Sequence, residues 1–104
     1  MEKLNLPPYN AKTRETDKRK QIYDPLRGKY VALTPEEWVR RHVVEYMRNE
    51  CGFQPEQIAE EHPIDINNMS QRADIVAFDN NSTPWVVVEC KEPNIKIDNA
   101  VLAQ

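Results

Sequence analysis

The pattern of apolar and polar positions predicts one amphipathic helix in the first half of the chain. Between residues 35 and 50, apolar residues recur at helical spacing. Thr34 suits the N-cap position, Pro35 suits the first helical position, and Glu37 completes a capping box. Gly52 is placed to end the helix, so this segment is the first element of the expected core.

Three apolar runs after the helix have the character of β-strands, at residues 59–66, 73–78 and 85–91. The polar residues 79–82 predict a hairpin turn between the last two runs, and a second helix is expected to open at 98–104. The sequence therefore predicts an α/β (α+β) fold. In this fold a helix is followed by a three-stranded antiparallel meander, and the chain is truncated before the final helix and strand.

The first 29 residues are polar and lack periodicity. We expect a polar N-terminal arm at residues 1–29 and a core at residues 30–104 that is incomplete at its C-terminus. Basic residues are frequent in the arm: Lys12, Arg14, Lys18, Arg19, Lys20, Arg27 and Lys29. A basic arm can contact phosphate groups, although a solvated tail is the commoner explanation of such a run.

Composition narrows the possible functions of the 104-residue chain. Its net charge of −3 argues against a general nucleic-acid coat protein, but it permits a nuclease, whose metal site needs carboxylates. No segment has the apolar core of a signal peptide or the length of a membrane span. We therefore expect a cytoplasmic protein with no membrane partner. Its cysteines, Cys51 and Cys90, are expected to be reduced, with Cys90 inert on the apolar side of its strand.

Charged residues interrupt the last two expected strands, where burial of a charge is costly unless it is paired or bound to a metal. Because side chains alternate along a strand, Asp74 and Val76 are expected to share one face, as are Glu89 and Lys91. Hairpin pairing places Asp74 near Val88, or directly opposite Glu89 if the register shifts by one residue.

Two neighbouring carboxylates repel each other unless a cation lies between them. Mg²⁺ prefers oxygen ligands, usually one or two carboxylates with water and phosphate oxygens. The pattern therefore indicates a magnesium-dependent phosphodiesterase, with Mn²⁺ expected to substitute for Mg²⁺. Asp74, Glu89 and the backbone carbonyl of Cys90 are the candidate ligands, and Lys91 is the candidate catalytic cation. The alternative from spacing alone is an ion-paired strand end in which Lys91 bridges the two acids.

These residues resemble the PD-(D/E)xK nuclease superfamily. From about residue 23 to residue 104, the chain is similar to the N-terminal domain of type I restriction enzyme R subunits. The similarity is carried by Tyr23-Asp24-Pro25-Leu26-Arg27, Leu33-Thr34-Pro35-Glu36-Glu37-Trp38-Val39-Arg40, Arg72-Ala73-Asp74-Ile75-Val76 and Val88-Glu89-Cys90-Lys91-Glu92-Pro93. The resemblance implies a restriction-endonuclease-like core and Mg²⁺-dependent cleavage of double-stranded DNA.

The resemblance also implies roles for single residues. The Asp and the Glu-x-Lys of such nucleases fall on Asp74, Glu89 and Lys91. A Glu on the first helix often joins the metal shell, and Glu37 is the candidate, with Glu36 as the alternative, although Glu37 is also the capping-box residue. A Gln on the helix after the Lys commonly contacts the site or the DNA, and Gln104 matches that place.

Two hypotheses follow. The first is a magnesium-dependent DNA endonuclease domain of restriction–modification type, with restriction-system subunits or a second copy of the chain as further partners. The alternative is a catalytically inactive nuclease-like module that binds DNA or a subunit. Arg40 is a candidate DNA-binding residue, although a salt bridge on the helix surface is the default for such an arginine. Ala73 departs from the superfamily pattern, which has Pro there, and the chain carries no helicase or translocase motor.

Overall fold

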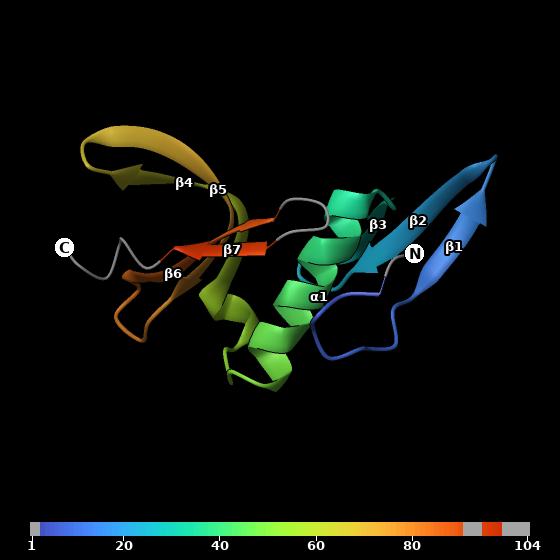
Figure 1. The fold of residues 1–104 in the computed structure, drawn as a ribbon, viewed down its shortest axis with the longest axis horizontal. Coiled ribbons are helices and arrows are strands. Elements are labelled where there is room, and N and C mark those ends of the chain that lie inside the picture. The colour runs from blue at the N-terminus through green and yellow to red at the C-terminus, as the bar shows by residue number, and fades with distance from the viewer. Residues whose placement is uncertain (1–2, 91–94, 99–104) are drawn as a thin grey trace.

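The computed structural model describes residues 3–90 and 95–98. The described residues form one α-helix, one short 3-10 helix (Pro55–Gln57) and seven strands in two antiparallel sheets (Figure 1). The chain therefore has the mixed α+β character that the sequence predicts.

The two sheets lie on either side of the helix α1 (Pro35–Asn49) (Figure 1). The first sheet has the order β1-β2-β3, with β1 (Thr13–Thr16), β2 (Arg19–Asp24) and β3 (Lys29–Ala32). The second sheet has the order β4-β5-β6-β7, with β4 (Ile58–Ile66), β5 (Met69–Phe78), β6 (Pro84–Cys90) and β7 (Ile95–Asp98).

The bounds of the helix are confirmed at both ends, but the predicted capping box is not, because the Glu37 carboxylate accepts from Arg40 and Arg41 while the Thr34 N–H donates to the Ala32 carbonyl. The Thr34 hydroxyl accepts a hydrogen bond from the backbone N–H of Glu37 at 3.0 Å, and Pro35 is the first helical residue. The helix ends at Asn49, and Gly52 then adopts a φ of 77°, a conformation that suits glycine after a helix C-terminus.

One face of α1 packs on the second sheet and forms the main core, here called the α1-side cluster. Its buried members are Val39, Val43, Val44, Met47, Ile58, Ile75, Ala77, Val88 and Cys90. A second cluster, the far-side cluster, contains Ile64, Ala73, Val76 and Val87. The two clusters have no buried member in common, so we assign them to the two faces of the second sheet.

The segment predicted as a polar arm instead contains the first sheet. Thr16 lies opposite Arg19 in the β1–β2 hairpin, and the turn residues Asp17 and Lys18 have φ values of 42° and 71°. Two-residue turns with positive φ match the twist of hairpin strands. Ile22 is the only apolar residue of this sheet among the fully buried ones, so the segment carries almost no apolar pattern to reveal its strands.

The strand register of the second sheet decides between the two predicted pairings. Ile75 lies opposite Val88 and Val76 opposite Val87, which is the register shifted by one residue from the nominal prediction. Continuing this pairing by one step places Asp74 opposite Glu89.

The C-terminal part of the second sheet corrects two further predictions. The meander has four strands in the described residues, because β7 pairs with β6 in the register Val87 opposite Asp98. Asp98 therefore ends a strand, where the sequence predicted the opening of a helix. Residues 99–104 of that predicted helix lie outside the described residues.

The strand β5 changes face at Asp74. In a regular strand Ala73 and Ile75 would share a face, yet Ile75 belongs to the α1-side cluster and Ala73 to the far-side cluster. The facing residue on β4, Glu61, has a φ of 48°, and the β4–β5 ribbon curls away from the sheet beyond this point (Figure 1). Asp74 therefore sits at a bend.

Replacing Ile75 with Ala tests the α1-side cluster. Ile75 is fully buried, so Ile75→Ala should lower the free energy of unfolding by about 2–5 kcal/mol. The control is Met69→Ala, which removes a side chain that is 62% exposed and should change stability by less than about 0.5 kcal/mol. Urea unfolding followed by circular dichroism measures both, and equal losses would contradict this assignment of the core.

Candidate functional site

The side chain of Asp74, at the bend in β5, contacts both the end of β6 and the helix α1. Its Oδ2 accepts a hydrogen bond from the backbone N–H of Cys90 at 2.7 Å, and its Oδ1 lies 3.7 Å from Nη2 of Arg40. The carboxylate therefore leans toward α1, and the expectation that it shares a face with Val76 is wrong. The face change at the bend is the physical reason.

Arg40 gathers the acidic groups at the start of α1 around one guanidinium. Its Nη1 donates to Glu37 at 2.8 Å and its Nη2 donates to Glu36 at 3.0 Å, in addition to the contact with Asp74. Arg40 is only 5% exposed. Its contacts are those of the salt-bridge alternative, and a phosphate contact by Arg40 stays a prediction.

Glu37 has no free oxygen for a metal ion in this arrangement. Its Oε1 accepts from Arg40, and its Oε2 accepts from Nε of Arg41 at 3.0 Å. A metal ion at Glu37 would therefore have to share its oxygens with two buried arginines, whose positive charges oppose a cation there. Within the described residues, no group of three or more His, Cys, Asp or Glu side chains is arranged to hold a metal ion.

Glu89 is the neighbour of Asp74 in strand register, but its expected direction differs. Regular alternation along β6 places Glu89 on the face of Val87, whereas Asp74 leans toward α1. Oxygen ligands from two carboxylates are chemically suited to Mg²⁺, but these two would chelate one ion only after one of them turns. The predicted residues Lys91 and Gln104 lie outside the described residues.

The side chain of Cys90 is buried on the apolar face of its strand, as the sequence predicts. It is 2% exposed and belongs to the α1-side cluster. Burial, followed by the negative charge of Asp74, raises the pKa of its thiol to about 12. The thiol is therefore neutral at physiological pH, and Cys90 contacts Asp74 through its backbone N–H, which donates to the carboxylate.

A second arginine on α1 forms a buried ionic network that sequence reasoning missed. Arg41 is 1% exposed and donates to Asp24 on β2, to Glu37 on its own helix and to Glu60 on β4. Arg27 extends this network, with Nη2 donating to Glu61 at 3.0 Å. The spacing of Glu36, Glu37, Arg40 and Arg41 was the available signal, because acids and bases four residues apart meet on a helix.

A comparison with protein families decides the affiliation of this fold and site. The family model for the type I restriction enzyme R protein N terminus matches residues 35–104. The chain belongs to this family. The match starts at the first residue of α1 and includes Asp74, Glu89 and Lys91. Membership of this family supports a role in a restriction system.

Two other comparisons found no relative of this R-protein N-terminal chain. A search of curated proteins found no match, and a search of solved structures found none either. The wider PD-(D/E)xK assignment stays a prediction. No helix in the described part of the chain combines the length and apolar character that crossing a membrane requires.

Removing the Arg41 guanidinium should strongly destabilise this R-protein chain. Arg41→Met removes the buried partner of Asp24, Glu37 and Glu60, which should cost about 3–5 kcal/mol of unfolding free energy. Arg48→Met is the control, because Arg48 lies on the same helix in a partly exposed pair with Glu45 at 3.4 Å and should cost at most about 1 kcal/mol. Urea titrations measure both values, and a loss at Arg41 no larger than at Arg48 would count against the network.

The two cysteines should differ sharply in reactivity. The thiolate is the reactive form, so the buried Cys90, with a pKa raised to about 12, should react slowly with iodoacetamide in the native protein at pH 8. The exposed Cys51 should react quickly. Mass spectrometry of Cys51→Ser should show no fast alkylation until denaturant is added, and rapid native labelling of Cys90 would refute its burial.

Proposed function

We propose that this chain is a magnesium-dependent DNA endonuclease domain of restriction–modification type, which hydrolyses phosphodiester bonds in double-stranded DNA. The proposal is supported by the strand register, in which Ile75 pairs with Val88; continued by one step, this register sets Asp74 opposite Glu89, two residues before Lys91. All three residues lie within the family match. The restriction-endonuclease-like core is part of the same proposal.

In this proposal the chain positions its own groups at the end of β6. The N–H of Cys90 orients the Asp74 carboxylate, and Lys91 follows Cys90 in sequence and stabilises the charge that develops on the phosphate. A bound Mg²⁺ would supply Lewis acidity and lower the pKa of an attacking water. Arg40 is the competing cation at Asp74, because its guanidinium lies 3.7 Å from the same carboxylate.

The contacts of Arg40 favour a second candidate function. A guanidinium that already compensates Asp74, Glu36 and Glu37 leaves less negative charge for a divalent ion. The alternative is therefore a nuclease-like module that binds DNA or a restriction-system subunit without cutting DNA. Such binding to DNA would depend on salt concentration and be indifferent to divalent metal.

Plasmid cleavage with site variants tests the endonuclease. Wild-type protein should nick or cut plasmid DNA with Mg²⁺ or Mn²⁺, and Asp74→Asn, Glu89→Gln and Lys91→Ala should each slow cutting by about 100-fold or more. The control is Asp65→Asn, an exposed carboxylate in the β4–β5 ribbon that accepts a hydrogen bond from Ser70 at 3.1 Å. This control should cut at the wild-type rate.

Two outcomes would overturn the endonuclease. Equal cutting by wild type and the three site variants would trace the activity to a contaminant or to another site. No cutting by wild type, combined with calorimetry that detects no Mn²⁺ binding and with salt-sensitive binding of duplex DNA, would establish the binding module instead.

A further inference from the structure

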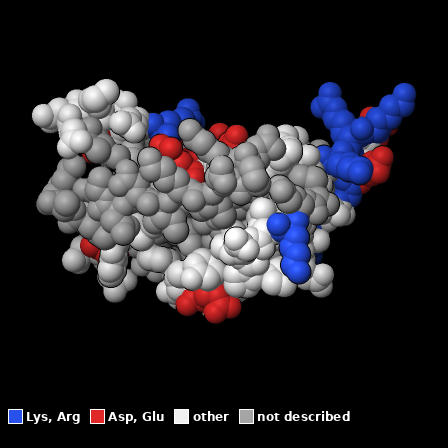
Figure 2. Space-filling model, in the orientation of Figure 1, with Lys and Arg blue, Asp and Glu red and all other residues white. Residues whose placement is uncertain are grey.

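The β1–β2 hairpin has a net positive charge, whereas the rest of the chain has a net negative charge. Residues 12–20 contain five basic and two acidic side chains, whereas the remainder of the chain contains nine basic and fifteen acidic ones. Figure 2 shows Lys and Arg side chains clustered at the end of the molecule where Figure 1 places this hairpin. The molecule thus has one basic end.

The basic side chains of the hairpin differ in their partners from four of the five arginines of the body, while the fifth, Arg72, donates to the backbone carbonyl of Glu61 at 3.2 Å. Each of the arginines at positions 27, 40, 41 and 48 forms an ion pair with a carboxylate. Arg14, Lys18, Arg19 and Lys20 are exposed, and none of them forms an ion pair with another described residue. None of these four charges is therefore held in an ion pair within the described part of the chain, although Glu15 lies opposite Lys20 in the strand register.

Arg14 is oriented by groups that leave its charge intact. Its Nε donates to the side-chain oxygen of Gln21 at 2.8 Å, and its guanidinium lies 4.0 Å from the ring centroid of Tyr30. A neutral amide and an aromatic face hold the side chain in place and cancel none of its charge. Such an oriented guanidinium can engage a phosphate with little further loss of side-chain freedom.

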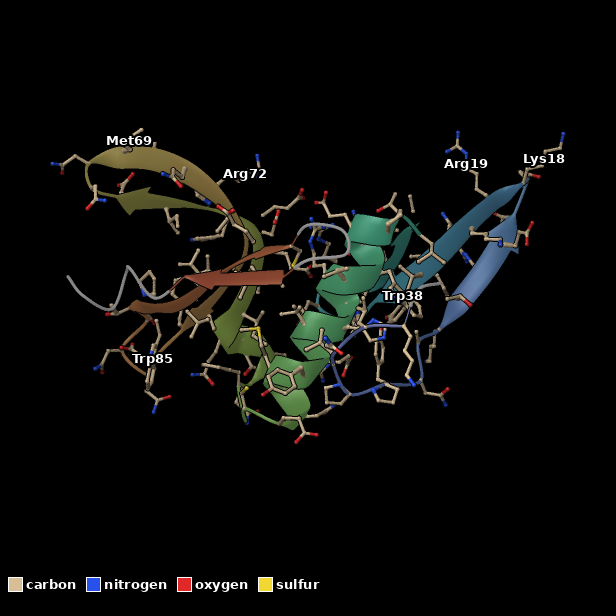
Figure 3. The ribbon with its side chains drawn as sticks, viewed as in Figure 1. Lys18, Arg19, Trp38, Met69, Arg72 and Trp85 are labelled. Carbon is tan, nitrogen blue, oxygen red and sulfur yellow. The ribbon has the colours of Figure 1, made fainter. Side chains whose placement is uncertain are left out.

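The hairpin has a shape that suits a duplex. Within β2, pairing with β3 begins at Gln21, so residues 15–20 form the two-stranded end of the hairpin beyond β3, and the Lys20 carbonyl accepts from the Leu33 N–H at 2.9 Å at its base. Arg14 lies opposite Gln21 and Thr16 opposite Arg19, which places Arg14 and Arg19 on one face. In Figure 3, Lys18 and Arg19 extend from the tip away from the body. A two-stranded ribbon of this kind fits the major groove of B-DNA.

We infer that the basic hairpin, residues 12–20, contacts the phosphate backbone of double-stranded DNA, at a place separate from Asp74. The DNA partner rests on the proposed function, but the contact itself requires no cleavage. Phosphate contacts fix position and orientation without reading sequence, so the hairpin anchors the chain on DNA. The net negative charge of the remainder of the chain favours a first approach of DNA through the hairpin.

Fluorescence anisotropy with a short labelled duplex in EDTA tests this anchor across a series of salt concentrations. Arg14→Gln/Arg19→Gln should bind several-fold more weakly, and the slope of log K against log salt should shrink by about 0.9 for each phosphate that the variant no longer neutralises. Arg14→Lys/Arg19→Lys keeps both charges and should retain most of the slope. The matched control is Lys29→Gln, an exposed lysine of the same sheet that lies opposite Asp24 and should keep the wild-type slope.

Three other results would reject the anchor. Wild-type affinity and slope in the Gln double variant, with an unchanged unfolding midpoint, would overturn the inference. An equal loss of affinity in Lys29→Gln would overturn it too, because net charge alone would then account for binding. Tight binding of single-stranded RNA without binding of duplex DNA would reject DNA as the partner. Asp65→Asn should bind as wild type does, and because the titrations contain EDTA they can be interpreted even if the cleavage test fails.

Discussion

The burial of Arg41 is the constraint on which the arrangement of this molecule depends. A guanidinium that is 1% exposed must be compensated, because an unpaired charge in the interior is strongly destabilising. Its three carboxylate partners come from β2, from α1 and from β4. One side chain therefore joins both sheets to the helix. The first sheet has little other attachment of this depth, since Ile22 belongs to neither buried apolar cluster.

Arg40 repeats this arrangement one position earlier on the helix. Where Arg41 links the two sheets, Arg40 links the start of α1 to Asp74 at the bend in β5. The candidate site is thus an extension of the ionic framework of the fold, and its acids have structural partners already. Any chemistry at Asp74 must compete with this framework, which makes Arg40 the natural point at which stability and function oppose each other.

The sequence predicted the elements whose apolar pattern is strong and failed where the pattern is weak. Capping at Thr34 and the apolar runs of β5 and β6 are local signals, so the helix and these strands were found. The first sheet is polar on most positions and β7 has four residues, so neither gave a periodicity to detect. In the site, spacing suggested that Asp74 and Glu89 are neighbours. It could not reveal the face change at Asp74, which arises from packing of the two clusters and from contacts with residues distant in sequence.

The position of Asp24 has a consequence for how this family's segment is delimited. Asp24 is fully buried and bonded to Arg41, yet it lies before residue 35, where the family match begins. A fragment cut at that boundary would retain Arg41 and Glu60 but lose the β2 carboxylate that helps to balance the guanidinium. The match to the family model therefore begins inside the ionic framework that joins the N-terminal sheet to α1.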